Sequence, residues 1–539
     1  MTAAAPPESA AEGERGPRGR RRPAVAVATG ILLSRLAGLV RERVFAHYFG
    51  AAGAADAFSA AFRIPNLLQN LFGEGALSAS FIPVYARLLA RGERADAGRV
   101  AGAVLALLSL AVSLLVLVGV LATPLVIDLI APGFTGERRA LTIVLVRVFF
   151  PSTGLLVLSA WCLGVLNSHG RFLLSYAAPV VWNAVIIATL LYYGGAGHQR
   201  PDQLALTVAW GSVLASALQF AVQLPVVLSL ARDLRVRLDI RSAEVRAVVR
   251  NFGPVFVGRG VVQLSAYVDQ ILSTLLPLGS VALIRYAQNL SVLPISLFGM
   301  SVSAAELPAM SGLHGSEAEV SAMLRARLDA GLGRIAFFVV PSAMAFLALG
   351  DVVAGLIYRT GRFTAGDTRW VWAILAGSAV GLLASTLGRL YSSAYYALRD
   401  TRTPLRYAVI RVTLTVVLGY ACALPLPRAI GIDPKWGMAG LTASAGVAGW
   451  VEFALLRRTL GARIGPTGIR LSRVASLWVA SALAAATGWL VRGVIPPGHP
   501  VLLGAAVLPA YGIVYLAATA ALGIPPAREL VRAAARRMR

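Results

Sequence analysis

The sequence predicts an all-α protein that crosses a membrane many times. Of its 539 residues, 57% are hydrophobic and only 14% are charged, whereas soluble domains average about 25% charged residues. The mean hydropathy is +0.71. Apolar stretches of about 20 residues, the length at which a helix spans a bilayer, recur along the whole chain. These observations together exclude an ordinary soluble fold.

We predict 14 transmembrane helices between two polar tails. Residues 1–22, which end in Gly-Arg-Arg-Arg, have the composition of a disordered basic tail. Residues 526–539 form a second basic tail with the pattern of a short surface helix. The predicted spans are 24–48, 55–86, 100–131, 140–168, 172–194, 203–231, 246–276, 280–312, 328–357, 370–398, 404–425, 436–457, 474–495 and 500–523.

The basic residues indicate how the chain is oriented. The net charge is +25, and 49 of the 50 basic residues are arginine, so Lys435 is the only lysine. If both termini are cytoplasmic, most loop arginines fall on the cytoplasmic side, as the positive-inside rule requires. This rule accounts for the basic composition, so we expect no nucleic-acid partner. We expect cytoplasmic N- and C-termini.

An internal repeat divides the spans into two lobes. LFGEGALSASFIP at 71–83 resembles LFGMSVSAAELP at 297–308, and VIDLIAPGFT at 126–135 resembles VAGLIYRTGRFT at 353–364. The copies are six spans apart, and an even number preserves orientation, so we expect parallel lobes related by a pseudo-two-fold axis. The predicted domains are an N-lobe at 23–231 (spans 1–6), a cytoplasmic linker at 232–250, a C-lobe at 251–460 (spans 7–12) and two extra C-terminal helices, spans 13 and 14, at 461–525.

Charged residues inside the first two spans mark the candidate site, because charges at membrane depth are costly and usually functional. In span 1, Arg35, Arg41 and Glu42 fall within a sector of roughly 120° on a helical wheel. Arg35 lies roughly 16 Å into the span, near mid-bilayer. We interpret it as part of an anion site, and the alternative is a structural ion pair with an acid of span 2. For Arg41, which is nearer the outer surface, the alternative is a snorkelling side chain.

Span 2 carries a narrower polar stripe. Asp56, Arg63, Asn70 and Glu74 fall within roughly 40° of one another, with Asn66 at the edge. Polar faces inside a bilayer must face each other or water. We favour Asp56 and Glu74 as partners that hold the arginines, with direct ligands as the alternative.

The C-lobe adds Arg259 and Arg285, together with Asp269 and Asn289. Arginines gathered from both lobes suit a ligand with more than one negative charge, because guanidinium binds phosphate oxygens bidentately and stays protonated. A lipid diphosphate is therefore the natural candidate. The five histidines fall at predicted loops or span ends without metal-ligand spacing. We therefore predict a transporter of an anionic substrate, not an enzyme, with no bound cofactor.

Two motifs resemble a known family. SRLAGLVRE, followed by DAFSAAFRIPNLLQNLFGEGALSASFIPV, is similar to the signature of the MurJ/MviN lipid II flippases of the MOP exporter superfamily, and RDTRTP at 399–404 is also similar. The resemblance covers about 24–525. It implies export of the undecaprenyl-diphosphate-linked peptidoglycan precursor across the bacterial cytoplasmic (inner) membrane, for cell-wall synthesis and cell shape, by alternating access. It places cavity residues on Arg35, Arg41, Glu42, Asp56 and Arg63.

The sequence departs from the family pattern at several positions. Gln69 and Asn70 replace two basic residues, and Asn289 replaces an arginine, for which Arg259 and Arg285 are candidate substitutes. Some relatives hold sodium between spans 7, 11 and 12.

For this cation site, Asp269 and Thr442 match, but Thr415 and Gly419 stand where side-chain ligands are expected. Coupling to sodium or to a proton therefore stays open.

We keep two alternative functions. One is a cation-coupled exporter of drugs, or of another polyprenyl-linked oligosaccharide, within the same superfamily; it predicts a cavity dominated by acids and aromatic residues. The other is a non-transporting scaffold for cell-wall enzymes, which predicts that the arginines can be replaced without loss. For the leading reading we expect lipid II and membrane lipids as partners, the cell-wall synthesis machinery as a further one, and a monomer.

Overall fold

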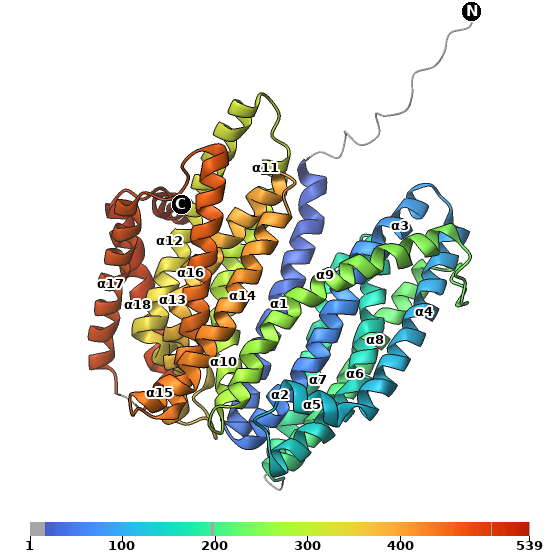
Figure 1. Cartoon of the computed structure of the whole chain (residues 1–539), viewed down its shortest axis with the longest axis horizontal. Coiled ribbons are helices and arrows are strands. Elements are labelled where there is room, and N and C mark those ends of the chain that lie inside the picture. Colours follow the sequence, from blue (N-terminus) through green and yellow to red (C-terminus); the bar gives the residue numbers. More distant parts are fainter. Residues whose placement is uncertain (1–16, 196–198, 497, 538–539) are drawn as a thin grey trace, which may run out of the picture. The chain divides into compact units, whose positions relative to one another are not determined.

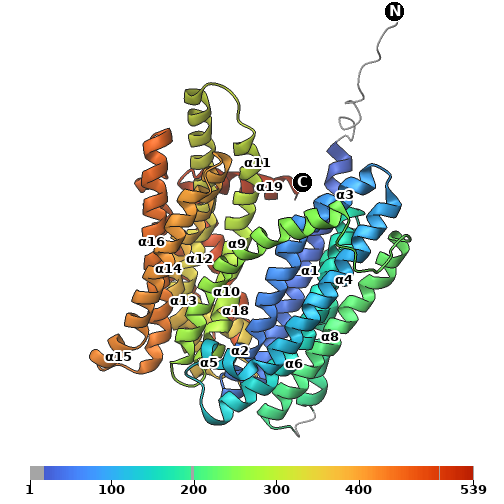
Figure 2. The ribbon, with the colours of Figure 1, turned by 45° about the vertical axis from the view of Figure 1, so that its right-hand side comes forward.

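The computed structural model describes residues 17–195, 199–496 and 498–537, and within them the regular structure is helical (Figures 1 and 2). The chain divides into two compact units. Unit 1 comprises Met1–Phe45, Ala61–Ile127 and Ala140–Leu264, and unit 2 comprises Ala46–Ala60, Asp128–Arg139 and Ser265–Arg539. Neither unit is continuous in sequence. Residues 46–60, which connect the first two helices, and residues 128–139 belong to unit 2, although the residues on either side of them belong to unit 1. The predicted N-lobe at 23–231 includes both of these segments, so the sequence analysis did not foresee that they pack with unit 2.

Unit 1 is a helical bundle around a large aromatic core. Trp161, Phe81 and Tyr85 are fully buried in it, and the Trp161 indole N–H donates to the Ala101 carbonyl at 3.2 Å. Its elements are the first part of α1 (Pro17–Phe49), the second part of α2 (Gly53–Leu68), η1 (Gln69–Leu77), α3 (Ser78–Ala90), α4 (Arg94–Leu121), most of α5 (Thr123–Ile130), most of α6 (Gly136–Ser168), α7 (Phe172–Thr189), η2 (Leu190–Gly194), α8 (Pro201–Leu230) and the first part of α9 (Ala243–Thr274).

Unit 2 is built around one central helix, α13, which packs on both α12 and α16. Gly381 of α13 lies against Gly446 of α16, where an added Cβ would come within 2.3 Å of the Gly446 backbone, so small residues set the helix separation. The elements after α9 are α10 (Ser280–Pro294), η3 (Ile295–Met300), α11 (Ser301–Ser311), α12 (Glu317–Tyr358), α13 (Ala365–Ala397), α14 (Arg402–Ala423), α15 (Pro425–Ala429), η4 (Pro434–Trp436), α16 (Gly437–Ile464), α17 (Leu471–Val494), α18 (Pro500–Ala521) and α19 (Pro525–Arg537).

The helices agree with a polytopic membrane protein. Among the described residues, 11 helical stretches are long and apolar enough to cross a bilayer. The other three predicted spans fall on α1, on α2 with η1 and α3, and on α9, the helices that carry most of the charged candidate residues. Helix α1 begins at Pro17, inside the predicted N-terminal tail, while residues 1–16 lie outside the described part of the chain.

The two copies of the repeat have the same local structure. Leu71-Phe72-Gly73 lies in the π-helical segment η1 and Leu297-Phe298-Gly299 lies in the π-helical segment η3, each between two α-helices. π-helical turns are rare and often occur at functional sites. Gly299 is buried against Thr386, where an added Cβ would come within 2.1 Å of the threonine methyl group. In the second copy, therefore, the glycine serves close packing.

Helix α12 is kinked near its end. Its 42 residues are interrupted at Leu349, whose backbone angles (φ −130°, ψ 16°) are not helical. Kinks leave carbonyls without helical partners. Here the indole N–H of Trp372 donates to the Leu347 carbonyl at 2.9 Å, and that of Trp489 donates to the Ala348 carbonyl at 3.1 Å. Two tryptophans from other helices therefore hold the kink.

Candidate functional site

The arginine with the most elaborate surroundings in unit 1 is Arg41 of α1. Its Nη2 donates to Glu42 Oε1 at 2.6 Å and its Nη1 donates to Asn183 Oδ1 of α7 at 3.1 Å. The guanidinium also lies over two aromatic rings, 5.0 Å from the Trp182 centroid and 5.8 Å from the Phe62 centroid. The Arg41 side chain keeps 20% of its surface exposed, whereas that of Glu42 keeps 5%.

The partners of Arg41 are themselves held in place. Asn183 Nδ2 donates to the Pro179 carbonyl at 2.9 Å, which turns the amide oxygen toward Arg41. The Trp182 indole N–H donates to Ser216 Oγ of α8 at 3.2 Å. A guanidinium fixed by a carboxylate, an amide and two rings is preorganised, so little freedom is lost when it binds an anion.

This arrangement can bind a phosphate or another oxyanion. A guanidinium has five N–H donors, and its contacts with Glu42 and Asn183 use only part of them. The Glu42 carboxylate balances the charge of Arg41 when the site is empty, which lowers the cost of burying the cation. The remaining N–H groups and the exposed fifth of the side chain are available to a ligand.

The other candidate residues of unit 1 are placed less tightly. Arg35 and Asn66 are exposed, and Arg63 and Asn70 are half-buried. Arg35 shares α1 with Arg41, and Arg63 follows Phe62 on α2. Glu74 in η1 and Arg259 in α9 have side chains outside the described part of the structure.

Asp56 has a structural place that the sequence analysis did not anticipate. It has no exposed surface, and its carboxylate accepts the backbone N–H of Gly279 at 2.7 Å and that of Ala282 at 2.9 Å. These N–H groups begin α10, so Asp56 caps this helix from another part of the chain. The arginine paired with it is Arg138, at 3.5 Å, and not an arginine of the predicted stripe.

The C-lobe candidates Arg285 and Asn289 are four residues apart on α10, and both are half-buried. Residues at this spacing share one helix face. The Arg285 guanidinium lies 5.2 Å from the ring centroid of Tyr286. Asn289 Nδ2 is buried without a hydrogen-bond partner among the described residues, as expected of an amide that serves a ligand or water.

Two positions of the candidate cation site, Thr442 and Gly419, are described by their nearest neighbours. The Thr442 hydroxyl lies 3.1 Å from the Ile374 carbonyl of α13, where Gly377 leaves it room. At Gly419 an added Cβ would meet the side chains of Leu441 and Leu272 at 3.1–3.2 Å and the Ser444 hydroxyl at 3.5 Å. Among the described residues, no group of three or more histidine, cysteine or acidic side chains could hold a metal ion.

The sequence analysis missed several polar residues that the structure brings together. Trp182 and Asn183 lie in the middle of a predicted span, and a polar amide at that depth was a usable signal. A second group lies in unit 2, where Arg411 of α14 pairs with Glu452 of α16 at 3.4 Å. These two residues are far apart in sequence, so no local pattern pairs them.

Comparisons with known proteins identify relatives of this chain among the lipid II flippases. Residues 45–505 match the family described as Lipid II flippase MurJ. The lipid II flippase MurJ of Burkholderia cenocepacia is 31% identical over 433 residues, which cover 79% of this chain and 80% of that protein. The probable lipid II flippase MurJ of Rhizobium meliloti is 30% identical over 474 residues, 85% of each chain.

Solved structures show the same fold. One titled Lipid II flippase MurJ, inward closed conformation, has a TM-score of 0.76 at 22% identity and covers 94% of this chain and 100% of that chain. An inward-facing multidrug resistance MATE family transporter of the MOP superfamily has a TM-score of 0.62 at 16% identity, covering 82% and 98%. The family match extends over most of the sequence, from residue 45 near the end of α1 to residue 505 in α18. The chain belongs to the MurJ family of lipid II flippases.

Proposed function

We propose that this protein moves lipid II from the inner to the outer leaflet of the bacterial cytoplasmic membrane by alternating access, and that arginines bind its diphosphate. The protein is a transporter and not an enzyme. The observation that carries the proposal is the Arg41 site, because a preorganised, largely buried guanidinium on a predicted transmembrane helix suits a phosphate group. Arg35 and Arg63 are proposed as further ligands, together with Arg259 of α9 and Arg285 of α10.

The proposal includes the finer organisation predicted from the sequence. We propose 14 spans in two parallel six-helix lobes plus two C-terminal spans, with both termini in the cytoplasm. Each predicted span coincides with helix in the structure, and the shared π-helical segment of η1 and η3 supports the repeat. The lipid tail stays in the membrane, along a groove formed by spans 13 and 14, while the diphosphate and sugars move.

The direct test is depletion of the protein in its host. We expect lipid II to accumulate on the inner leaflet as the protein disappears, and to return to normal when the wild-type gene is restored. Normal lipid II distribution after complete depletion would contradict the proposal.

The arginines are tested in the same depleted strain. Arg35→Ala and Arg63→Ala should insert at native levels but fail to restore transport, and Arg63→Lys should restore part of it, because the charge survives while the bidentate geometry is lost. Arg200, an exposed arginine at the start of α8, provides the control, since Arg200→Ala should transport normally. Full complementation by both alanine variants would favour the scaffold alternative.

A further inference from the structure

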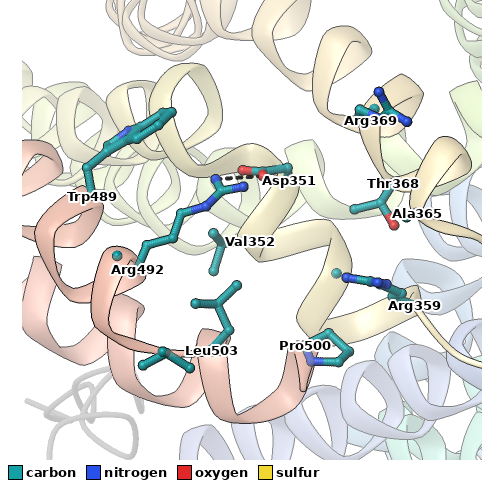
Figure 3. A pocket seen from close by; sticks show the side chains of 13 residues that line it. Asp351, Val352, Arg359, Ala365, Thr368, Arg369, Trp489, Arg492, Pro500 and Leu503 are labelled. Carbon is teal, nitrogen blue, oxygen red and sulfur yellow. Dashed lines mark ion pairs between the residues drawn. The ribbon is translucent and has the colours of Figure 1, made fainter. Parts of the chain in front are cut away.

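A basic cavity lies at one end of unit 2 and contains none of the residues proposed for the flipping site. It has a volume of about 670 Å³ and is enclosed by the ends of α12 and α17 and the starts of α13 and α18 (Figure 3). This size is within the range of small-molecule sites, about 300–1,000 Å³. The cavity is large enough for more than an inorganic ion.

The charged residues that line the cavity are mainly arginines. Arg359, Arg369 and Arg492 come from three different elements, and Asp351 is the one acid among the lining residues. Arg492 pairs with Asp351 at 2.7 Å. Arg359 and Arg369 form no ion pair among the described residues, so two cationic side chains remain uncompensated. Such a concentration of positive charge attracts an anion.

The wall that carries Asp351 and Arg492 is held rigidly. Asp351 follows the Leu349 kink of α12, and the Trp489 indole N–H fixes this kink by donating to the Ala348 carbonyl. The guanidinium of Arg492 lies 5.2 Å from the Trp489 ring centroid. The ion pair, the ring contact and the kink therefore reinforce one another, and the cavity is formed before any ligand binds.

The surroundings of the cavity indicate where its ligand comes from. Leu490 and Val494 of α17 are 74% and 84% exposed, and Leu502 of α18 is 61% exposed. Side chains of this kind face lipid in a membrane protein. Trp489, 56% exposed, is the residue type enriched where lipid tails meet headgroups. The helices α17 and α18 that border the cavity thus also carry exposed apolar side chains, which suits a phospholipid ligand.

We propose that this cavity is a phosphate-binding site that takes the headgroup of an anionic phospholipid. The uncompensated arginines Arg359 and Arg369 bind the phosphate, and the acyl chains lie along the exposed apolar side chains of α17 and α18. In the orientation proposed above, this end of unit 2 faces the outer leaflet. The site goes beyond lipid II transport, because it binds a lipid that is not transported.

The test measures phosphatidylglycerol retained by the full-length protein in native mass spectrometry after incubation with increasing lipid concentrations. Arg359→Gln/Arg369→Gln should weaken retention roughly tenfold or more, since hydrogen bonds to charged groups are lost. Asp351→Asn should strengthen it severalfold, because Arg492 is released from its pair. Added salt should weaken retention by the wild type.

The matched control removes the same charge at the same end of unit 2. Arg428→Gln/Lys435→Gln lies in the connection between α14 and α16 and outside the cavity, and it should retain the lipid like the wild type. An equal loss of lipid retention in both double variants, or no loss in Arg359→Gln/Arg369→Gln, would contradict the proposed site. A second arm adds glycerol phosphate, the same headgroup chemistry without tails. If glycerol phosphate displaces the bound phosphatidylglycerol as effectively as the same concentration of added lipid does, the ligand is a soluble phosphate compound and the lipid assignment is wrong.

Discussion

At the scale of single residues, the charged side chains of the first two spans have two different tasks. Arg41 faces a carboxylate, an amide and two rings and keeps part of its surface exposed. Asp56 is completely buried and accepts two backbone N–H groups of α10. A helical wheel ranks both residues alike as polar groups in an apolar stretch. The difference is tertiary, since it depends on which other segment comes close.

Removing Arg41 should reduce both stability and transport. Arg41→Ala leaves the buried Glu42 without the cation at 2.6 Å, which we expect to cost about 3 kcal/mol. The double variant Arg41→Ala/Glu42→Gln should recover the melting temperature but not transport, because the buried charge is gone while the ligand remains missing. Recovery of transport in the double variant would show that Arg41 acts only by neutralising Glu42.

Replacing Asp56 should act through folding. Asp56→Ala leaves the N–H groups of Gly279 and Ala282 buried without an acceptor, so we expect a loss of about 2 kcal/mol or more. Thermal unfolding of the purified protein measures this, with Asp202→Asn, an exposed acid at the start of α8, as the control that should melt like the wild type. An unchanged melting temperature in Asp56→Ala would mean that the cap contributes nothing.

At the scale of elements, the connection between α13 and α14 shows how a short motif gains a fixed shape. Arg399 has a left-handed backbone (φ 60°) after the end of α13, the conformation that commonly terminates helices. Asp400 then accepts the backbone N–H of Thr403 at 3.0 Å and its hydroxyl at 2.7 Å, and Arg463 of α16 donates to it at 2.6 Å. These bonds explain RDTRTP as a turn with a helix start.

The same connection predicts a pH dependence of stability. The N–H and hydroxyl of Thr403, followed by Arg463, lower the pKa of Asp400 from 3.8 to about 2. A pKa lowered by folding contributes stability above the unfolded value, and this is lost as pH falls from about 4 toward 2. The melting temperature of the wild type should therefore fall more steeply in this range than that of Asp400→Asn. Parallel curves would exclude the contribution.

The repeat shows what a sequence can and cannot predict about elements. The sequence LFG occurs at 71–73 and again at 297–299, and both copies are π-helical. The π-helical hydrogen-bond pattern itself was not predictable, because no residue preference distinguishes it from an α-helix over so few residues. The kink at Leu349 could not be predicted from the local sequence either. It is stabilised by Trp372 and Trp489, which lie outside the local sequence.

At the scale of the whole molecule, apolar stretches and charge were enough to predict a polytopic helical membrane protein, and 11 of the 14 predicted spans correspond to helices of the described residues that are long and apolar enough to cross a bilayer. They were not enough to predict the two units. Residues 46–60 and 128–139 pack with unit 2 although their neighbours in sequence pack with unit 1. The signals for this exchange are single contacts, such as Tyr286 donating to the Gly50 carbonyl at 3.0 Å. Hydropathy does not encode such contacts.

Transport should follow the membrane potential or a proton gradient and not a sodium gradient. Gly419 supplies no side-chain oxygen at a position where a sodium ligand is expected, and an added Cβ there would meet the side chains of Leu441 and Leu272. One charge moved through 100 mV is worth about 2.3 kcal/mol, enough to drive a conformational cycle. Vesicles in which potential and sodium gradient are set independently provide the measurement. Sodium-driven transport at zero potential that is lost in Asp269→Asn would contradict this expectation.

Lys435, in η4 before α16 and 5.8 Å from the ring centroid of Trp370, is the only lysine of the chain. It is therefore a unique chemical handle, because an amine-reactive ester has no other side-chain target in the protein. In the proposed topology Lys435 faces outward and the terminal amine faces the cytoplasm. A membrane-impermeant ester added to intact cells should label the wild type once and leave Lys435→Arg unlabelled. Labelling of Lys435 only after the cells are opened would reverse the orientation of every span.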